Sequence, residues 1–338
     1  MISKKIELHV HLEGSIRPAT LLEIARRNGE VLPANTVDGL EELYRFTDFR
    51  HFLDVWVMTT NCLRTADDFR RVVVDYAKQA RDHGAVYLEA IFSPAERVQD
   101  HGIGWDEIYT GYSEGAIEAQ ERFGLTVRLT PDLYRGCPVE LAEACATVSV
   151  RYRDRGMVGL GIGGNELQGP LEPYRKAIQI AQDGGLPFVP HAGEAAGRQS
   201  IQEALNLGAV RLRHGIRAAD DPHLLTEIVE RGVVLDVCPT SNLRTGVVKH
   251  LAAHPLPRLR DAGVACSINT DDPAMFGTDL GREHELASQL GVTAADAYAA
   301  GLAGALCEEA VKERVAGMAP DPFSGRNGPV HNGPRLRS

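Results

Sequence analysis

The chain lacks several features that would assign it to a functional class. It has no basic tract, and its formal net charge is -10 over 338 residues, so nothing electrostatic supports binding to nucleic acid or an anionic membrane. No apolar run approaches transmembrane length, and no signal-peptide core follows the first residues, so we expect a cytoplasmic protein. The six cysteines form no CxxC pair and are typical of reduced, mostly buried thiols.

Three catalytic motifs are also missing. No GxGxxG follows the first β-like run, as it would in a doubly wound nucleotide-binding sheet. The region that ends the fourth run, 159–166, has no lysine, which many two-metal barrel hydrolases need as a modified bridge between the ions, so a single metal is favoured. The HxE…PCxxC signature of the His/Cys deaminases is absent as well.

Eight short β-like runs, separated by helical patterns, organise what is present. Several are continuous apolar runs, as expected of strands buried on both faces. Eight alternations of strand and helix predict an α/β fold, specifically a (β/α)8 TIM barrel, with a doubly wound open sheet as the competing fold. The runs are Lys5–Val10, Val86–Phe92, Thr126–Leu133, Val158–Gly163, Pro187–His191, Arg211–Gly215, Val233–Cys238 and Ala265–Asn269.

The connection between the first two strands is longer than one crossover requires. It predicts helices over Pro18–Asn28, Phe49–Leu63 and Ala66–Asp82, of which only the last is needed. We therefore expect an insertion, about residues 15–65, to form a helical lid over the C-terminal face of the barrel.

The aromatic residues of this insertion have two interpretations. Phe49 and Trp56 either build a small helical core or form an apolar cover on a flat ligand, and both can hold because a lid must also pack. We expect residues 1–318 to form a single metal-dependent barrel domain. Residues 319–338, rich in proline and glycine, are expected to form a disordered tail.

Histidines and acids gather where the strands are expected to end. His9 and His11 are two residues apart in a strand, so their side chains point to the same side, here the barrel interior. His191 ends the fifth run, and the acidic pair Asp271-Asp272 follows the eighth. A single strand histidine is more often a hydrogen-bonded core residue, but three imidazoles and a carboxylate suit Zn²⁺ with water at an open position.

Two further residues are candidates for proton transfer. Glu194 follows His191 by three residues; in isolation it would be a solvated loop acid, whereas beside a metal ligand it is placed to act on substrate or water. His214 ends the sixth run and is compatible either with core hydrogen bonding or with catalysis.

These motifs together resemble the adenosine deaminase family of the amidohydrolase superfamily. They span most of the expected barrel, in order. The matching segments are Glu7-Leu-His-Val-His-Leu-Glu-Gly14, Gly163-Gly-Asn-Glu166, His191-Ala-Gly-Glu194, His214-Gly215, Cys238-Pro-Thr-Ser-Asn242 and Ser267-Ile-Asn-Thr-Asp-Asp-Pro273.

The resemblance implies a cofactor and a division of roles. One Zn²⁺ per chain would be bound by His9, His11, His191 and Asp271. Glu194 would protonate purine N1, while His214 and Asp271 would orient and deprotonate the water that attacks C6. The residues implied to contact the substrate are His11, Glu13, Gly164 (through its amide, at N3), Asp272 (at N7), Phe49 and Trp56.

Two departures from the family pattern bear on the substrate. Adenosine deaminases usually carry aspartate where this chain has Glu13, and Asp-Leu-Ala-Gly where it has Gly161-Ile-Gly-Gly164. Glutamate at the first position is common among adenine deaminases and relatives acting on 5′-substituted adenosines such as aminodeoxyfutalosine, whereas the segment 240–246 is similar to the nucleoside branch.

We therefore expect a small-molecule purine nucleoside and water as the partners of the chain. The activity implied is deamination of adenosine or a 5′-substituted adenosine, with adenine deamination as the alternative. A non-catalytic purine-binding protein is a remote alternative, because every implied ligand and Glu194 are retained. The sequence contains no indication of the oligomeric state.

Overall fold

The structure is a computed structural model that describes residues 2–46 and 49–320, without the side chains of Phe49, Arg50 and Leu53. The expected tail, 319–338, and the expected contact of Phe49 with substrate therefore lie almost wholly outside the described residues.

Eight parallel strands form two four-stranded sheets with the orders β1-β2-β3-β4 and β5-β6-β7-β8. Isolated bridges connect the halves along both edges: Val10 pairs with Asp271, and Leu160 pairs with Phe188. The chain thus has an α/β fold in which two half-barrels of parallel strands meet edge to edge. The strands are β1 (Lys5–His11), β2 (Ala85–Phe92), β3 (Thr126–Tyr134), β4 (Gly161–Gly163), β5 (His191–Ala192), β6 (Arg211–His214), β7 (Val234–Val237) and β8 (Cys266–Ile268).

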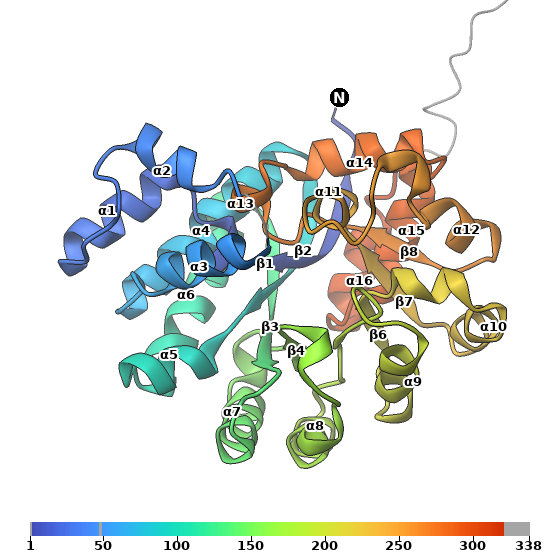
Figure 1. Cartoon of the computed structure of the whole chain (residues 1–338), viewed down its shortest axis with the longest axis horizontal. Coiled ribbons are helices and arrows are strands. Elements are labelled where there is room, and N and C mark those ends of the chain that lie inside the picture. The colour runs from blue at the N-terminus through green and yellow to red at the C-terminus, as the bar shows by residue number, and fades with distance from the viewer. Residues whose placement is uncertain (1, 47–48, 321–338) are drawn as a thin grey trace, which may run out of the picture.

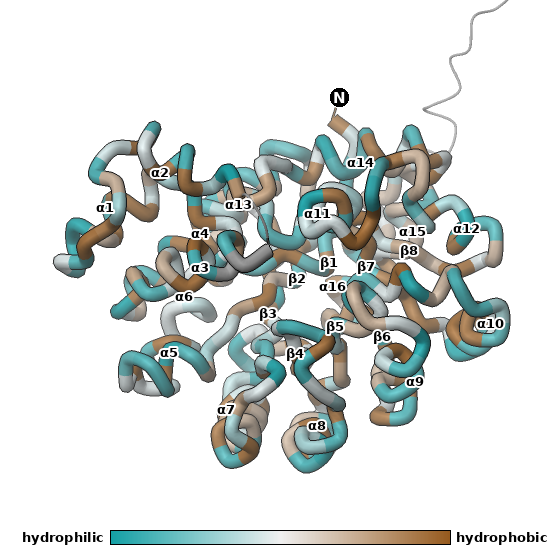
Figure 2. Tube along the Cα trace, viewed as in Figure 1, coloured by the Kyte–Doolittle hydropathy of each residue, from teal (hydrophilic) through white to brown (hydrophobic). Residues whose placement is uncertain are grey.

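Helices surround the strands (Figure 1), and hydrophilic and hydrophobic residues alternate along them (Figure 2). None of the described helices is long and apolar enough to cross a membrane. The helices are α1 (Pro18–Asn28), α2 (Val37–Leu43), α3 (Phe49–Thr60), α4 (Ala66–Asp82), α5 (Pro94–His101), α6 (Trp105–Phe123), α7 (Val139–Arg151), α8 (Arg175–Asp183), α9 (Arg198–Asn206), α10 (Pro222–Glu230), α11 (Pro239–Arg244), α12 (Leu256–Asp261), α13 (Pro273–Phe276), α14 (Leu280–Gln289), α15 (Ala294–Gly304) and α16 (Glu309–Ala316).

The fifth strand is shorter than predicted. Only His191 and Ala192 pair regularly, whereas Phe188 makes isolated bridges to both neighbouring strands. Pro187 and Pro190 explain the difference, because proline has no N–H to donate to the ladder. The segment nevertheless runs in the predicted direction and places His191 at its end.

The predicted long connection after β1 contains α1, α2 and α3 before the crossover helix α4. These three helices lie at one side of the ring of strands (Figure 1). Two of them were predicted from the sequence, at 18–28 and 49–63. The helix α2 was not predicted; it begins after Thr36, whose side chain accepts a hydrogen bond from the Gly39 N–H.

Charged residues inside the ring of strands are paired. Arg211 of β6 is buried, with its Nη2 2.7 Å from Glu89 Oε2 and its Nε 2.8 Å from Asp236 Oδ2. A buried guanidinium without such partners would be strongly destabilising. This group lies near the N-terminal ends of the strands, which leaves the opposite ends for the candidate site.

Candidate active site

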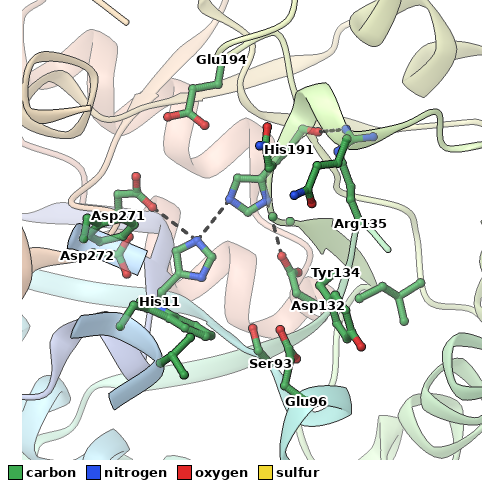
Figure 3. A pocket seen from close by; sticks show the side chains of 18 of the residues that line it. His11, Ser93, Glu96, Asp132, Tyr134, Arg135, His191, Glu194, Asp271 and Asp272 are labelled. Atoms are coloured by element: carbon green, nitrogen blue, oxygen red, sulfur yellow. Dashed lines mark hydrogen bonds and ion pairs between the residues drawn. The ribbon is translucent and has the colours of Figure 1, made fainter. Parts of the chain in front are cut away.

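A cavity of about 340 Å³ opens at the C-terminal ends of the strands. Figure 3 shows His11, His191 and Asp271 pointing toward one another at its base, with Glu194 on the facing side. Of the residues predicted from sequence, those that line the cavity are His11, Trp56, Gly164, His191, Glu194, His214, Asp271 and Asp272.

The four predicted metal ligands converge on one point. Asp271 Oδ1 lies 3.2 Å from His9 Nε2 and 3.3 Å from His11 Nε2, and the latter lies 3.1 Å from His191 Nε2. Four ligands at about 2.0–2.1 Å from a tetrahedral Zn²⁺ would be about 3.3 Å apart. These three distances are close to that value, and three imidazole nitrogens with one carboxylate oxygen suit Zn²⁺. Among the described residues, the groups of possible ligand atoms within 4.8 Å of one another are His9, His191, His214 and Asp271, and His11, Asp271 and Asp272, so the ligand set itself stays a prediction.

The histidines are in the form that binds a metal. Burial lowers the pKa of His9 and His191 well below the usual range and also lowers that of His11, against the opposing charge of Asp271. All three imidazoles are therefore neutral at pH 7. His191 Nδ1 donates to the carbonyl of Ile162 at 3.0 Å, which leaves the lone pair of its Nε2 facing the other ligands.

Asp271 is held so that its two oxygens face different groups. Oδ1 faces the histidine ligands, while Oδ2 accepts a hydrogen bond from Ser241 Oγ at 2.5 Å and lies 3.8 Å from His214 Nε2. Burial opposes the charge of Asp271, but His9 and the other histidines hold the pKa of this carboxyl well below its usual range. Asp271 is thus ionised and has one oxygen free of the ligand set.

A hydrogen-bond chain leads from His254 to His214 and selects the tautomer of its neutral form. The backbone N–H of Leu256 donates to His254 Nδ1, so the neutral His254 carries its proton on Nε2 and donates it to Asn242 Oδ1 at 3.1 Å. The amide nitrogen of Asn242 then faces His214 Nδ1 at 3.4 Å. Burial lowers the pKa of His254 to about 4, which keeps it neutral. In neutral His214, this orientation places the proton on Nε2, which faces Asp271 and Glu194.

His214 and Asp271 share an uncommon backbone conformation. Their φ angles are 61° and 65°, and among the described residues no other non-glycine residue has a positive φ. Such left-handed backbone costs energy for a residue with a side chain and is found where function requires it.

Glu194 sits on a loop that one buried carboxylate organises. Glu166 accepts the backbone N–H groups of residues 193–196, including that of Glu194 at 3.1 Å, and also the Ser200 hydroxyl. Burial raises the pKa of Glu194, and the charge of Asp271 adds to this against the effect of His214. The loop therefore presents a carboxyl group that retains its proton more readily than an ordinary glutamate.

Asp272 is the second carboxyl that favours its protonated form. Burial raises its pKa well above the usual range, and the charge of Asp271 adds to this. Its Oδ1 has no hydrogen-bond partner among the described residues. A Cβ on Gly14 would lie 1.8 Å from this oxygen, so glycine at position 14 is what allows Asp272 to occupy its place.

Glu13 occupies a different position from the other predicted contacts. It is 1% exposed and is not part of the cavity wall; its Oε1 accepts the Ser93 N–H at 2.9 Å and the Tyr112 hydroxyl at 3.0 Å. Ser93 itself lines the cavity. A contact of Glu13 with the substrate remains a prediction.

The sequence profile of the adenosine deaminase family matches residues 4–317. The chain belongs to the adenosine deaminase family. It is 55% identical over 319 residues to an aminodeoxyfutalosine deaminase from Acidothermus cellulolyticus, covering 92% of this chain and 89% of the relative. It is also 35% identical to an adenine deaminase from Cupriavidus necator, covering 87% and 84%.

Solved structures of related proteins have the same fold. An adenine deaminase from Arthrobacter aurescens is 28% identical, with a TM-score of 0.87 over 94% of this chain and 98% of that chain. An amidohydrolase from Burkholderia ambifaria with bound zinc is 26% identical, with a TM-score of 0.84 over 94% and 89%. As a member of the adenosine deaminase family, the chain is a metal-dependent enzyme that catalyses hydrolytic deamination.

Four residues of the cavity wall of this deaminase were not predicted from the sequence. Asp132, Tyr134 and Arg135 at the end of β3 line the cavity, as does Glu96, whose pKa is raised to about 8 by burial. One signal was available: Asp132 is an acid inside a predicted buried strand. No comparable signal marked Glu96, because its place in the wall depends on how α5 packs after β2.

We expect His9→Ala to lose the metal of this deaminase. The substitution removes one of four donors from a tetrahedral set, so the zinc content after dialysis against zinc-containing buffer should fall well below one ion per chain. Metal analysis of the purified protein measures this. His223→Ala, which changes an exposed histidine away from the cavity, is the matched control. Full zinc occupancy in His9→Ala would contradict the ligand assignment.

Proposed function

We propose that this enzyme removes the 6-amino group of an adenine-containing nucleoside by hydrolysis, with one Zn²⁺ per chain held by His9, His11, His191 and Asp271. The observation that carries the proposal is the pair of carboxyl groups, Glu194 and Asp272, that line one cavity with the proposed ligands and whose pKa values are both raised by burial. A purine has lone pairs at N1 and N7 on the two sides of the C6 amino group, so two opposed donors are complementary to it.

Each side chain then has a defined task. Zn²⁺, when bound, would lower the pKa of a water molecule toward about 7 and so supply the nucleophile. Glu194 donates its proton to N1, which makes C6 more electrophilic, while Asp272 donates to N7 and Gly164 offers its amide to N3. With its proton on Nε2, His214 donates a hydrogen bond to the attacking oxygen, and Asp271, whose Oδ2 lies 3.8 Å from that nitrogen, accepts the water's proton.

The group on purine N9 is proposed to be an elaborated ribose. A cavity of about 340 Å³ falls within the range of roughly 300–1,000 Å³ that accommodates drug-sized ligands, so it has room for more than a purine ring. The relative that is 55% identical is named aminodeoxyfutalosine deaminase, which favours a 5′-substituted adenosine of that kind. Free adenine is the second candidate, favoured by the adenine deaminases among the relatives.

The helices after β1 are proposed to cover this group. Phe52, Trp56 and Val57 of α3 line the cavity, and Phe52 stacks on Phe276 with ring centroids 5.1 Å apart. These helices lie outside the repeating strand-and-crossover-helix units of the barrel. An apolar wall on such an insertion is what we expect of a lid.

An ammonia-release screen tests the proposal directly. We expect aminodeoxyfutalosine to give the highest kcat/KM, adenosine a lower one and adenine the lowest, because only the first two fill the cavity beyond the ring. Deoxyadenosine, methylthioadenosine and adenosylhomocysteine extend the series. Preference for free adenine over every nucleoside would contradict the proposal for N9, and no deamination of any member would contradict the proposed reaction.

We expect Glu194→Gln to retain zinc and fold but to lose kcat by about 10²–10⁴-fold, the usual contribution of general acid catalysis. Glutamine has nearly the same shape and still donates a hydrogen bond, but it cannot transfer a proton to N1. The wild-type rate should also fall as the pH rises through the raised pKa of Glu194, and this limb should be absent from the variant. A variant with near wild-type kcat would rule out the proton-donor role.

We expect Trp56→Ala to raise KM for the preferred nucleoside by up to roughly tenfold, since an aromatic contact contributes about 0.5–1.5 kcal/mol. Zinc content should not change, because the residue does not contact the ligand set. Steady-state kinetics with metal analysis measures both. Trp105→Ala, which alters the other tryptophan at a site away from the cavity, is the control and should affect stability only. An unchanged KM in Trp56→Ala would assign Trp56 to packing.

A further inference from the structure

A buried ion pair lies directly behind the ligand His191. Asp132 of β3 is 1% exposed, and its Oδ1 accepts a hydrogen bond from Nη1 of Arg213 of β6, which is fully buried. Arg213 also donates from Nη2 to Thr130 Oγ1 at 2.8 Å, so both ends of the guanidinium are anchored to β3. The pair therefore spans the interior between the two half-barrels.

The second oxygen of Asp132 is not used by this pair. Asp132 Oδ2 has no hydrogen-bond partner among the described residues, and it lies 3.5 Å from His191 Nδ1 (Figure 3). That nitrogen carries the proton it donates to the Ile162 carbonyl, so the carboxylate faces the positive end of an N–H bond. A metal-binding histidine is usually oriented through its other ring nitrogen in this way.

Two glycines make room for the arrangement. Gly161, paired with Asp132 in the register of β3 and β4, has no Cβ; one added there would lie 2.1 Å from Asp132 Oδ1 and 2.2 Å from Arg213 Nη1. A Cβ on Gly163 would lie 3.2 Å from Asp132 Oδ2. The φ of Gly161 is not positive, so space rather than backbone conformation requires glycine at this position. The aspartate that adenosine deaminases usually carry at position 161 would not fit beside the pair.

We propose that Asp132 is a positioning residue for the metal ligand His191, anchored by Arg213 and accommodated by the missing side chain of Gly161. The three residues act as one unit: Arg213 fixes the carboxylate, the carboxylate orients the imidazole through its Nδ1–H, and Gly161 leaves the space for both. The proposal rests on the metal site proposed above and gives the absent side chain of Gly161 a function in it.

The test measures Zn²⁺ affinity of the metal-free protein by competition with a chromogenic chelator, without substrate. We expect Asp132→Asn to weaken zinc binding by about 10–100-fold, the usual effect of losing such an outer partner. Asparagine keeps the shape but removes the charge beside His191 Nδ1. Gly161→Ala should weaken zinc binding as well, and its effect should not add to that of Asp132→Asn, because Gly161→Ala displaces the same carboxylate whose charge Asp132→Asn removes.

Two controls separate positioning from stability. Glu89→Gln removes a carboxylate from the other buried arginine of β6, Arg211, away from the cavity; it should lower the thermal midpoint and leave zinc affinity unchanged. Asp132→Asn combined with Arg213→Met removes the unpaired buried cation; it should recover thermal stability relative to Asp132→Asn alone but not zinc affinity.

The outcomes are distinct. Wild-type zinc affinity in Asp132→Asn, or recovery of that affinity in the double variant, would overturn the proposal; unchanged affinity with a raised KM would make Asp132 a substrate contact instead. If the wild-type protein itself binds no zinc, the proposed function fails, a result that is separate from any difference between the variants.

Discussion

The candidate metal site depends on one constraint: its four proposed donor atoms come from three separate strand ends and must meet, away from water, at the spacing of about 3.3 Å that a tetrahedral ion sets. His9 and His11 come from β1, His191 from β5, and Asp271 from the residues after β8, where it also closes the ring through backbone bonds with β1. The segment that pairs with β1 at one of the two junctions of the half-barrels therefore also carries the carboxylate of Asp271. One segment therefore takes part both in the closure of the ring and in the candidate metal site.

A layer of polar residues outside the ligands makes this convergence possible. Ser241, Asn242 and Glu166 contact no ligand of the metal except Asp271, yet they determine which oxygen, ring nitrogen or loop faces the cavity. In a buried site each unpaired polar group is costly, so the layer must be satisfied as a whole. The protonated forms favoured by Glu194 and Asp272 arise from the same dry surroundings.

The strand ends, and the cavity position of the side chains that follow them, could be predicted because they follow from local pattern, whereas the role of these side chains as metal ligands stays a prediction. The i, i+2 spacing of His9 and His11, the apolar run before His191 and the acid pair after the eighth run each determine a place in a parallel barrel. The fold's parallel strands and the family were read correctly on this basis. Asp132, Arg213 and Glu96 were missed because their roles depend on side chains that cross from one strand to another, which no single segment of sequence records.

The backbone of His214 and Asp271 has a consequence for the evolution of this enzyme. Both residues hold a left-handed conformation that glycine adopts without cost, whereas a side-chain-bearing residue loses of order 1 kcal/mol. Backbone strain alone would therefore favour glycine at the two positions whose side chains we propose carry the chemistry. Stability and activity are opposed at these sites by the geometry of the chain itself, and any thermostable descendant must gain its resistance to heat elsewhere.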